Sequence, residues 1–225
     1  FDYVTLIGVL EYSIYYVGGD SPFLDMLKKA RSYLKPGGKL IVAIENKYGL
    51  KYFAGCREDH LGTYFSSIEN YADGGGVRTF GRKGLEQIFA ACGVEERHFY
   101  YPYPDYKFMT TVYSDKHQPG VGELSNNLRN FDRDRMLLFH EKNAFDGLCK
   151  DGLFPVFSNS YLVVLGEDIP VEYARYSNDR APQYQIKTTI VEKEDGGKEV
   201  RKYPISEAAK EHIANLQIAY EGLEK

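Results

Sequence analysis

The sequence has no tryptophan and only three cysteines, Cys56, Cys92 and Cys149, among its 225 residues. The cysteines are odd in number and widely spaced, and no two of them form a C-x-x-C pair. This pattern excludes a disulfide framework and a cysteine-based zinc or redox motif. We interpret each cysteine as a small buried apolar residue and expect the protein to work in the reducing cytoplasm.

The chain also lacks an excess of basic residues and a long apolar run. It has 28 Lys and Arg against 32 Asp and Glu, a net charge of −4, and no basic patch that predicts nucleic-acid binding. No run reaches the roughly 18 apolar residues of a membrane span, and no signal peptide is visible. Phe1 opens directly into an apolar stretch, so we expect the chain to be a fragment of a longer protein.

Tyrosine, in contrast, is abundant, with 20 residues beside 13 phenylalanines. Tyrosine combines apolar area with a hydroxyl group. This richness fits a wide polar-ligand surface, such as one for carbohydrate, and it fits a tyrosine-rich core and rim equally well.

The first part of the chain predicts a βαβ unit. Residues 1–10, FDYVTLIGVL, form an apolar, β-branched run typical of a buried strand. Residues 21–34 predict a helix with Ser21 as its cap and Pro22 at its first position. The turn KPGG ends this helix, and KLIVAI at 39–44 predicts a second strand. Such a unit is parallel and right-handed.

The rest of the chain predicts further elements of both kinds. DGG at 195–197 is a hairpin signal, and Ser206 is the expected cap of a helix that runs to about residue 224. Residues 45–80 predict a long loop, a type of segment that is often functional. The other expected elements are a helix over 81–92, strands in 94–104 and 108–114, a mostly helical stretch over 131–151, and an antiparallel last strand at 161–165.

Three segments resemble class I methyltransferases. FDYVTLIGVLEY resembles the fourth-strand motif of that family, LKPGGKLIVAIEN the end of a helix and the fifth strand, and VRTFGRKGLEQIFAACGV the next helix. The resemblance implies an α/β fold with a partial Rossmann-like sheet that comprises strands four to seven. It divides the chain into the C-terminal half of a methyltransferase domain at 1–168, a linker at 169–182, and the hairpin and helix of another module, a small ββα extension, at 183–225.

The resemblance implies methyl transfer that depends on S-adenosylmethionine. NKYGLKYFAGCREDHLGTYF and YYPYPDYKF are similar to a bacterial subgroup of multidomain proteins in surface-polysaccharide synthesis, which implies O-methylation of a sugar or glycan acceptor. The family's glycine-rich cofactor turn and its ribose-binding acid are not found and are expected upstream of Phe1. GGG at 74–76 is no substitute, because no strand precedes it. One alternative is a non-catalytic interaction module of a glycan-synthesis protein, and a second is a different transferase that uses the same half-sheet.

Candidate site residues follow from the expected end of each strand. By resemblance, Gly8, Val9 and Leu10 would line the cofactor; the alternative is plain strand termination. Glu11, Glu45 and His60 are the candidate bases, since O-methylation requires a hydroxyl to lose its proton. His60 lies among acidic neighbours, an arrangement that is also typical of a solvated turn. One histidine beside acids does not predict a metal site.

Polar and aromatic residues near these strand ends are the expected substrate contacts. Arg78 would hold an anionic group or form a surface ion pair, and the tyrosines near residue 103 would stack on sugar rings or pack the loop. The expected substrate-binding residues are Tyr12, Asn46, Tyr48, Arg57, Asp59, Arg78, Tyr103 and Tyr106.

Residues 3–9 are expected to form an unpaired apolar edge. In the family the fourth strand is central and pairs with the first, which this sequence lacks. An unpaired edge invites pairing with another chain. We therefore predict self-association through this strand, or a companion fragment bound to it.

Overall fold

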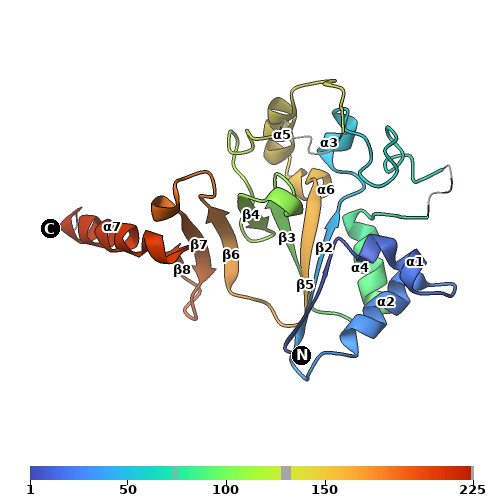
Figure 1. Cartoon of the computed structure of the whole chain (residues 1–225), viewed down its shortest axis with the longest axis horizontal. Helices are drawn as coiled ribbons and strands as arrows, with labels where there is room; N and C mark the ends of the chain where they lie inside the picture. The colour runs from blue at the N-terminus through green and yellow to red at the C-terminus, as the bar shows by residue number, and fades with distance from the viewer. Residues whose placement is uncertain (73, 75, 128–132, 224–225) are drawn as a thin grey trace.

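The computed structural model describes residues 1–72, 74, 76–127 and 133–223. These residues contain one eight-stranded mixed sheet with the strand order β1-β2-β5-β3-β4-β6-β7-β8 (Figure 1). The β1–β2 pair is parallel, and every other neighbouring pair is antiparallel. The prediction of an α/β fold is confirmed.

The expected βαβ unit forms the start of the chain. Strand β1 (Tyr3–Ile7) pairs in parallel with β2 (Lys39–Glu45), and helix α2 (Pro22–Arg31) connects them. Ser21 is at the N-cap of α2, but its side chain makes no capping hydrogen bond, contrary to expectation. Two short elements not foreseen from the sequence, η1 (Leu10–Tyr12) and α1 (Ser13–Tyr16), follow β1 directly.

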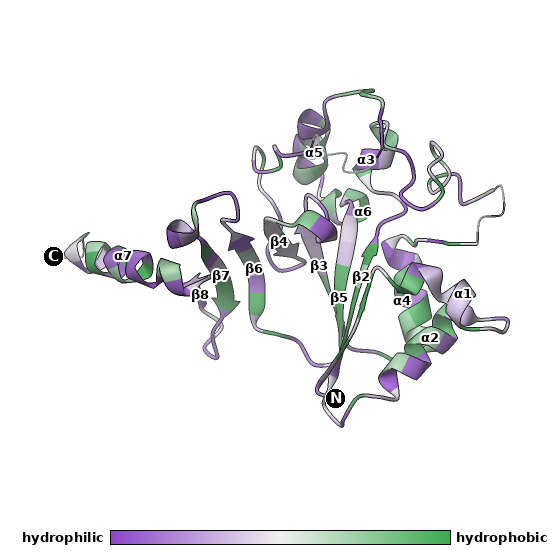
Figure 2. Cartoon of the chain, in the orientation of Figure 1, coloured by the Kyte–Doolittle hydropathy of each residue, from purple (hydrophilic) through white to green (hydrophobic). Residues whose placement is uncertain are grey.

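Strand β2 lies at the centre of the core because both of its faces are covered. Strand β5 (Ser160–Leu165) runs antiparallel between β2 and β3 (Arg97–Tyr103), which confirms the expected reversed strand. Apolar residues of α2, of α4 (Arg82–Ala91), of α5 (Glu141–Lys150) and of α6 (Phe154–Phe157) complete one hydrophobic cluster with these strands. Figure 2 shows the hydrophobic colouring of β2.

The C-terminal part continues the same sheet. Strand β6 (Val171–Tyr176) pairs with β4 (Thr111–Ser114) on one side and with β7 (Ile186–Glu192) on the other. The stretch expected to be a polar linker therefore contains a strand, since its apolar positions, such as Ala174, are buried within the sheet. The division of the chain into domains stays a prediction.

The expected hairpin is confirmed, because β7 and β8 (Lys198–Pro204) pair in full register around the DGG turn. The remaining short elements are α3 (Leu50–Phe53), η2 (Tyr106–Phe108), η3 (Pro182–Tyr184) and η4 (Glu207–Ala209). Helix α7 (Lys210–Leu223) follows and projects from the sheet in Figure 1. No residue of α7 is buried, and the whole of that helix lies within the described residues.

The expectation of helix over 131–151 is wrong for its first part. Only α5 is helical there, while residues 133–139 form no helix. The backbone N–H groups of Met136 and Leu138 donate to the carbonyl oxygens of Gly55 and Ala54. These long-range bonds replace the local bonds of a helix. Residues 131 and 132 lie outside the described residues.

Strand β1 occupies one edge of the sheet, as expected, and β8 occupies the other. On β1, the side chains of Tyr3 and Ile7 are 60% and 55% exposed. Among the residues that the structure describes, no helix is long and apolar enough to cross a membrane.

Candidate functional site

Two buried carboxylates lie beyond the carboxyl ends of the parallel strands. Glu11 is in η1, just after β1, and Glu45 is the last residue of β2. The backbone turns away from β1 at Gly8, which has a φ of +62°. Because β1 and β2 are parallel, their carboxyl ends share one edge, where ligands bind in open α/β sheets. Glu11 is 1% exposed and Glu45 is fully buried.

His60 reaches the same place from the long loop after β2. Its Nδ1 atom lies 2.9 Å from Glu58 Oε1, and Glu58 Oε2 accepts hydrogen bonds from the backbone N–H groups of His60 and Leu61. Tyr71 also donates its hydroxyl to Glu58. Glu58 therefore fixes both the loop backbone and the imidazole ring, and the interpretation of residues 57–60 as a solvated turn fails because Glu58 is buried.

The three predicted bases converge. His60 Nε2 lies 3.6 Å from Glu11 Oε1 and 3.9 Å from Glu45 Oε2. Tyr12 packs its ring edge-on against the imidazole, with the ring centroids 5.2 Å apart. In the sequence these residues stand apart as separate candidates, and the fold brings them into one cluster.

Two lysines border the cluster, and neither was predicted from the sequence as a site residue. Lys107 Nζ lies 2.5 Å from Glu45 Oε1, and Lys51 Nζ lies 2.9 Å from both Asp59 and Asp105. In the chain, Lys51 comes after β2 and Lys107 comes after β3. A lysine a few residues after a strand is too common in sequences to predict a functional role. The predicted residue Asp59 lies here as well.

Electrostatics set the charge states of the cluster. Burial disfavours the charged form of His60, but the nearby carboxylates of Glu11, Glu58 and Glu45 outweigh it and raise the pKa of His60 to about 10. Burial raises the pKa of Glu45, partly offset by Lys51 and Lys107. In the chain without a further cation, His60 is therefore an imidazolium at neutral pH and does not itself accept a proton.

A pocket of about 400 Å³ opens beside the cluster. It is lined by Gly8, Val9, Tyr12, Tyr16 and Met26. A Cβ atom on Gly8 would lie 2.8 Å from the hydroxyl of Tyr106. Glycine therefore permits a close approach of the backbone to this tyrosine. Two of the three residues predicted to bind a cofactor line this pocket.

The third residue predicted to bind a cofactor, Leu10, is fully buried in the hydrophobic core. Asn46 is likewise fully buried, and its amide donates to the carbonyl oxygens of Val156 and Ser158. Its Oδ1 accepts a hydrogen bond from the backbone N–H of Tyr48. The contacts of Asn46 therefore hold β2 to the start of β5.

The remaining predicted substrate residues fall into two groups. Tyr106 belongs to the site, because its hydroxyl donates to Glu45 Oε1 at 3.2 Å. Arg57 packs over the ring of Tyr64, and Arg78 lies over Tyr71, so both contact their own loop. Tyr103 is buried, and its hydroxyl accepts a bond from a backbone N–H outside the cluster.

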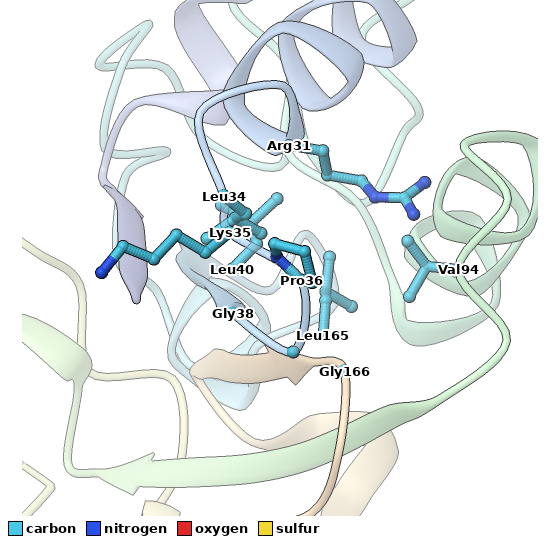
Figure 3. A pocket seen from close by; sticks show the side chains of 10 residues that line it. Arg31, Leu34, Lys35, Pro36, Gly38, Leu40, Val94, Leu165 and Gly166 are labelled. Carbon is cyan, nitrogen blue, oxygen red and sulfur yellow. The ribbon is translucent and has the colours of Figure 1, made fainter. Parts of the chain in front are cut away.

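A second pocket, of about 390 Å³, lies at the opposite end of β2. It surrounds the 35–38 turn and is lined by Leu40, Leu165 and Gly166, with Arg31 and Val94 beside it (Figure 3). Because ligands of open α/β sheets bind at the carboxyl ends of strands, this pocket is the weaker candidate. Arg31 donates to the carbonyl oxygen of Cys92, which ties α2 to the end of α4.

Comparisons with known proteins leave the family open: no protein-family model, no curated protein and no solved structure matches this chain. The geometry of the cluster and its pocket must therefore carry the functional argument.

Proposed function

We propose that this chain carries the catalytic part of a methyltransferase domain that transfers a methyl group from S-adenosylmethionine to a hydroxyl of a sugar or glycan. The observation that carries the proposal is the convergence of Glu11, Glu45 and His60 beyond the carboxyl ends of β1 and β2. The resemblance of the strand and helix motifs to class I methyltransferases supports it. The reversed strand β5, next to β2, is what the expected seventh strand of such a sheet requires.

The pocket beside the cluster fits one end of the cofactor. Gly8 lines it, and Val9, Tyr12 and Met26 provide an apolar surface. S-adenosylmethionine supplies an electrophilic methyl group when it is bound. The adenosine-binding turn belongs, by the same resemblance, to sequence upstream of Phe1.

The chain's own residues would act on the acceptor. The buried carboxylates Glu11 and Glu45 are placed to take the proton of the acceptor hydroxyl as its oxygen attacks the methyl carbon. Tyr106 and Lys107 hold Oε1 of Glu45 and so fix that carboxylate. The main contribution to catalysis is the positioning of the acceptor in line with the methyl group.

The proposal is tested by titrating S-adenosylhomocysteine into a longer chain that includes the upstream strands. We expect Gly8→Val to weaken binding at least about tenfold, a loss of about 1.4 kcal/mol. Gly152→Val is the matched control, since Gly152 also has a positive φ but has no described atom within 4 Å of its Cβ position. Absence of binding by the unmodified chain, or equal binding by both variants, would contradict the proposal and favour a non-catalytic interaction module.

A further inference from the structure

The cluster contains buried carboxylate oxygens that receive no hydrogen bond from the residues that the structure describes. They are Oε2 of Glu11 and Oε2 of Glu45. The distances from His60 Nε2 to the two carboxylates, 3.6 and 3.9 Å, are longer than an N–H···O hydrogen bond of about 2.7–3.2 Å. A buried carboxylate oxygen without a partner is costly, so the arrangement calls for a further positive group.

We propose that Glu11, Glu45 and His60 bind one divalent transition-metal ion, for which Zn²⁺ is the best match. One ligand atom from each residue lies within 4.8 Å of the other two. Zinc binds histidine nitrogen and carboxylate oxygen at about 2.0–2.2 Å, so ligand atoms of a tetrahedral ion lie about 3.3–3.6 Å apart. The two separations, 3.6 and 3.9 Å from His60 Nε2 to the carboxylates, lie at or just above this range. Three protein ligands with a fourth position open are the pattern of catalytic zinc sites.

The surrounding contacts prepare each ligand for this role. Glu58 binds Nδ1 of His60, so Nε2 is the ring nitrogen turned toward the two carboxylates. A carboxylate behind a metal-binding histidine is the usual arrangement, because it fixes the tautomer and the ring orientation. Lys107 and Tyr106 occupy Oε1 of Glu45, which leaves Oε2 for the ion.

Charge and ligand chemistry favour the same ion. Carboxylates outnumber the ammonium groups around the site, so a divalent cation lowers the uncompensated negative charge. The imidazole selects against Mg²⁺ and Ca²⁺, which prefer oxygen ligands only. The carboxylates here are those of Glu11, Glu45, Glu58, Asp59 and Asp105, and the ammonium groups are those of Lys51 and Lys107.

The role of the ion rests on the proposed function, whereas its binding does not. Tyr12 contacts the His60 ring and also lines the neighbouring pocket, so the cluster and the pocket adjoin. With the ion bound, Glu11 and Glu45 would serve as its ligands in place of their role as bases. The ion would bind the acceptor hydroxyl oxygen and lower the pKa of that hydroxyl, and water would receive the proton.

Calorimetric titration of Zn²⁺ into the metal-stripped chain tests the site without any methyl transfer. We expect one ion per chain, and we expect Glu11→Gln and His60→Asn each to weaken binding at least about 100-fold. Glu58→Gln should weaken it about 10–100-fold, the usual effect of losing such a supporting carboxylate. His98→Asn is the matched control, because His98 also lies beside a carboxylate, that of Asp168, but outside the cluster.

Two results would overturn the proposal: no zinc binding by the unmodified chain, or the same affinity in the control and in Glu11→Gln. Glu11→Gln keeps the shape of the side chain, so it decides the matter even where His60→Asn fails to fold, as judged by circular dichroism. S-adenosylhomocysteine binding by the longer chain, measured in the presence of a chelator, is a separate readout. Failure of the longer chain to bind S-adenosylhomocysteine counts against the methyltransferase proposal. Failure of the chain to bind zinc counts against the metal site.

Discussion

At the scale of single residues, Glu58 organises the candidate site. Its Oε2 atom accepts hydrogen bonds from the backbone N–H groups of His60 and Leu61, and its Oε1 atom contacts the imidazole. These bonds, chiefly those of His60 and Leu61, outweigh the effect of burial and lower the pKa of Glu58. A buried carboxylate held in this way stabilises the loop that carries His60.

Replacement of Glu58 by Gln should lower the free energy of unfolding by about 1–3 kcal/mol, because the amide leaves one of these donors without an acceptor. Urea unfolding in the presence of a chelator measures this change. Glu199→Gln is the control, since Glu199 forms an exposed pair with Arg201, and it should change stability by less than about 0.5 kcal/mol. Equal losses in the two variants would show that Glu58 does not support the loop.

Gly8 offers a second comparison at this scale. Gly8 and Gly152 have φ values of +62° and +69°, so alanine at either position carries the same backbone penalty, about 1–2 kcal/mol. Only Gly8→Ala also drives a Cβ atom against the hydroxyl of Tyr106. We expect Gly8→Ala to cost at least about 1 kcal/mol more than Gly152→Ala in thermal unfolding. Equal losses of stability in the two variants would mean that the Tyr106 side chain moves aside without an energetic cost.

The cysteines make a prediction about reactivity. Burial raises the pKa of the Cys56 thiol to about 11, and Cys56 is less exposed than Cys149. Because the thiolate is the reactive form, iodoacetamide should alkylate Cys149 faster than Cys56 at about pH 8. In denaturing urea the two rates should become similar. Faster alkylation of Cys56 than of Cys149 in the folded chain would contradict the buried position of Cys56.

At the scale of elements, β2 is the strand on which the site depends. Ile44, next to Glu45, is fully buried. Ile44→Ala should lower the free energy of unfolding by about 2–5 kcal/mol. The same substitution at Ile218 of α7, which is 68% exposed, should change it by less than about 0.5 kcal/mol. A small loss at Ile44 would argue against β2 as a central strand.

The sequence predicted the elements that depend on local pattern. The parallel unit of residues 1–44, the helix after Gly81 and the hairpin at 195–197 follow from apolar periodicity and turn residues, and the structure has them all. Strand β6 and the non-helical run at 133–139 were not predicted, because their hydrogen bonds go to partners far away in the sequence. Periodicity carries no information about such partners.

The candidate site was predictable only in pieces. Glu11 and Glu45 could be placed at strand ends, but His60 could not be joined to them, because nothing in a loop sequence fixes where it folds back. Lys107 and the unpartnered oxygens of the carboxylates depend on side-chain geometry and were beyond prediction. The three proposed metal ligands are brought together only by folding, so their spacing in the sequence shows no metal-binding pattern.

At the scale of the whole molecule, the two edges of the sheet differ in charge. Strand β1, YVTLI, has no charged residue, whereas β8, KEVRKYP, has a charge at most positions. Charged side chains on an edge strand oppose pairing with another chain. We therefore expect a second copy of the chain to pair with β1 and not with β8.

Light scattering over a range of concentrations should show association of the unmodified chain. Ile7→Lys should reduce it, because the substitution places a charge on β1, where Ile7 is exposed. Val200→Lys, at an exposed position of β8, is the control and should leave it unchanged. A chain that stays monomeric at high concentration would remove the basis for this interface.

Calorimetric titration with S-adenosylhomocysteine tests the central claim most directly. It is performed on this 225-residue chain and on a longer chain that includes the expected upstream strands. The account predicts binding by the longer chain alone, because the adenosine-binding turn is expected upstream while Gly8, Val9 and the carboxylate cluster are in this part. Binding by neither chain would contradict the assignment to methyl transfer and would leave the cluster of Glu11, Glu45 and His60 to serve another chemistry.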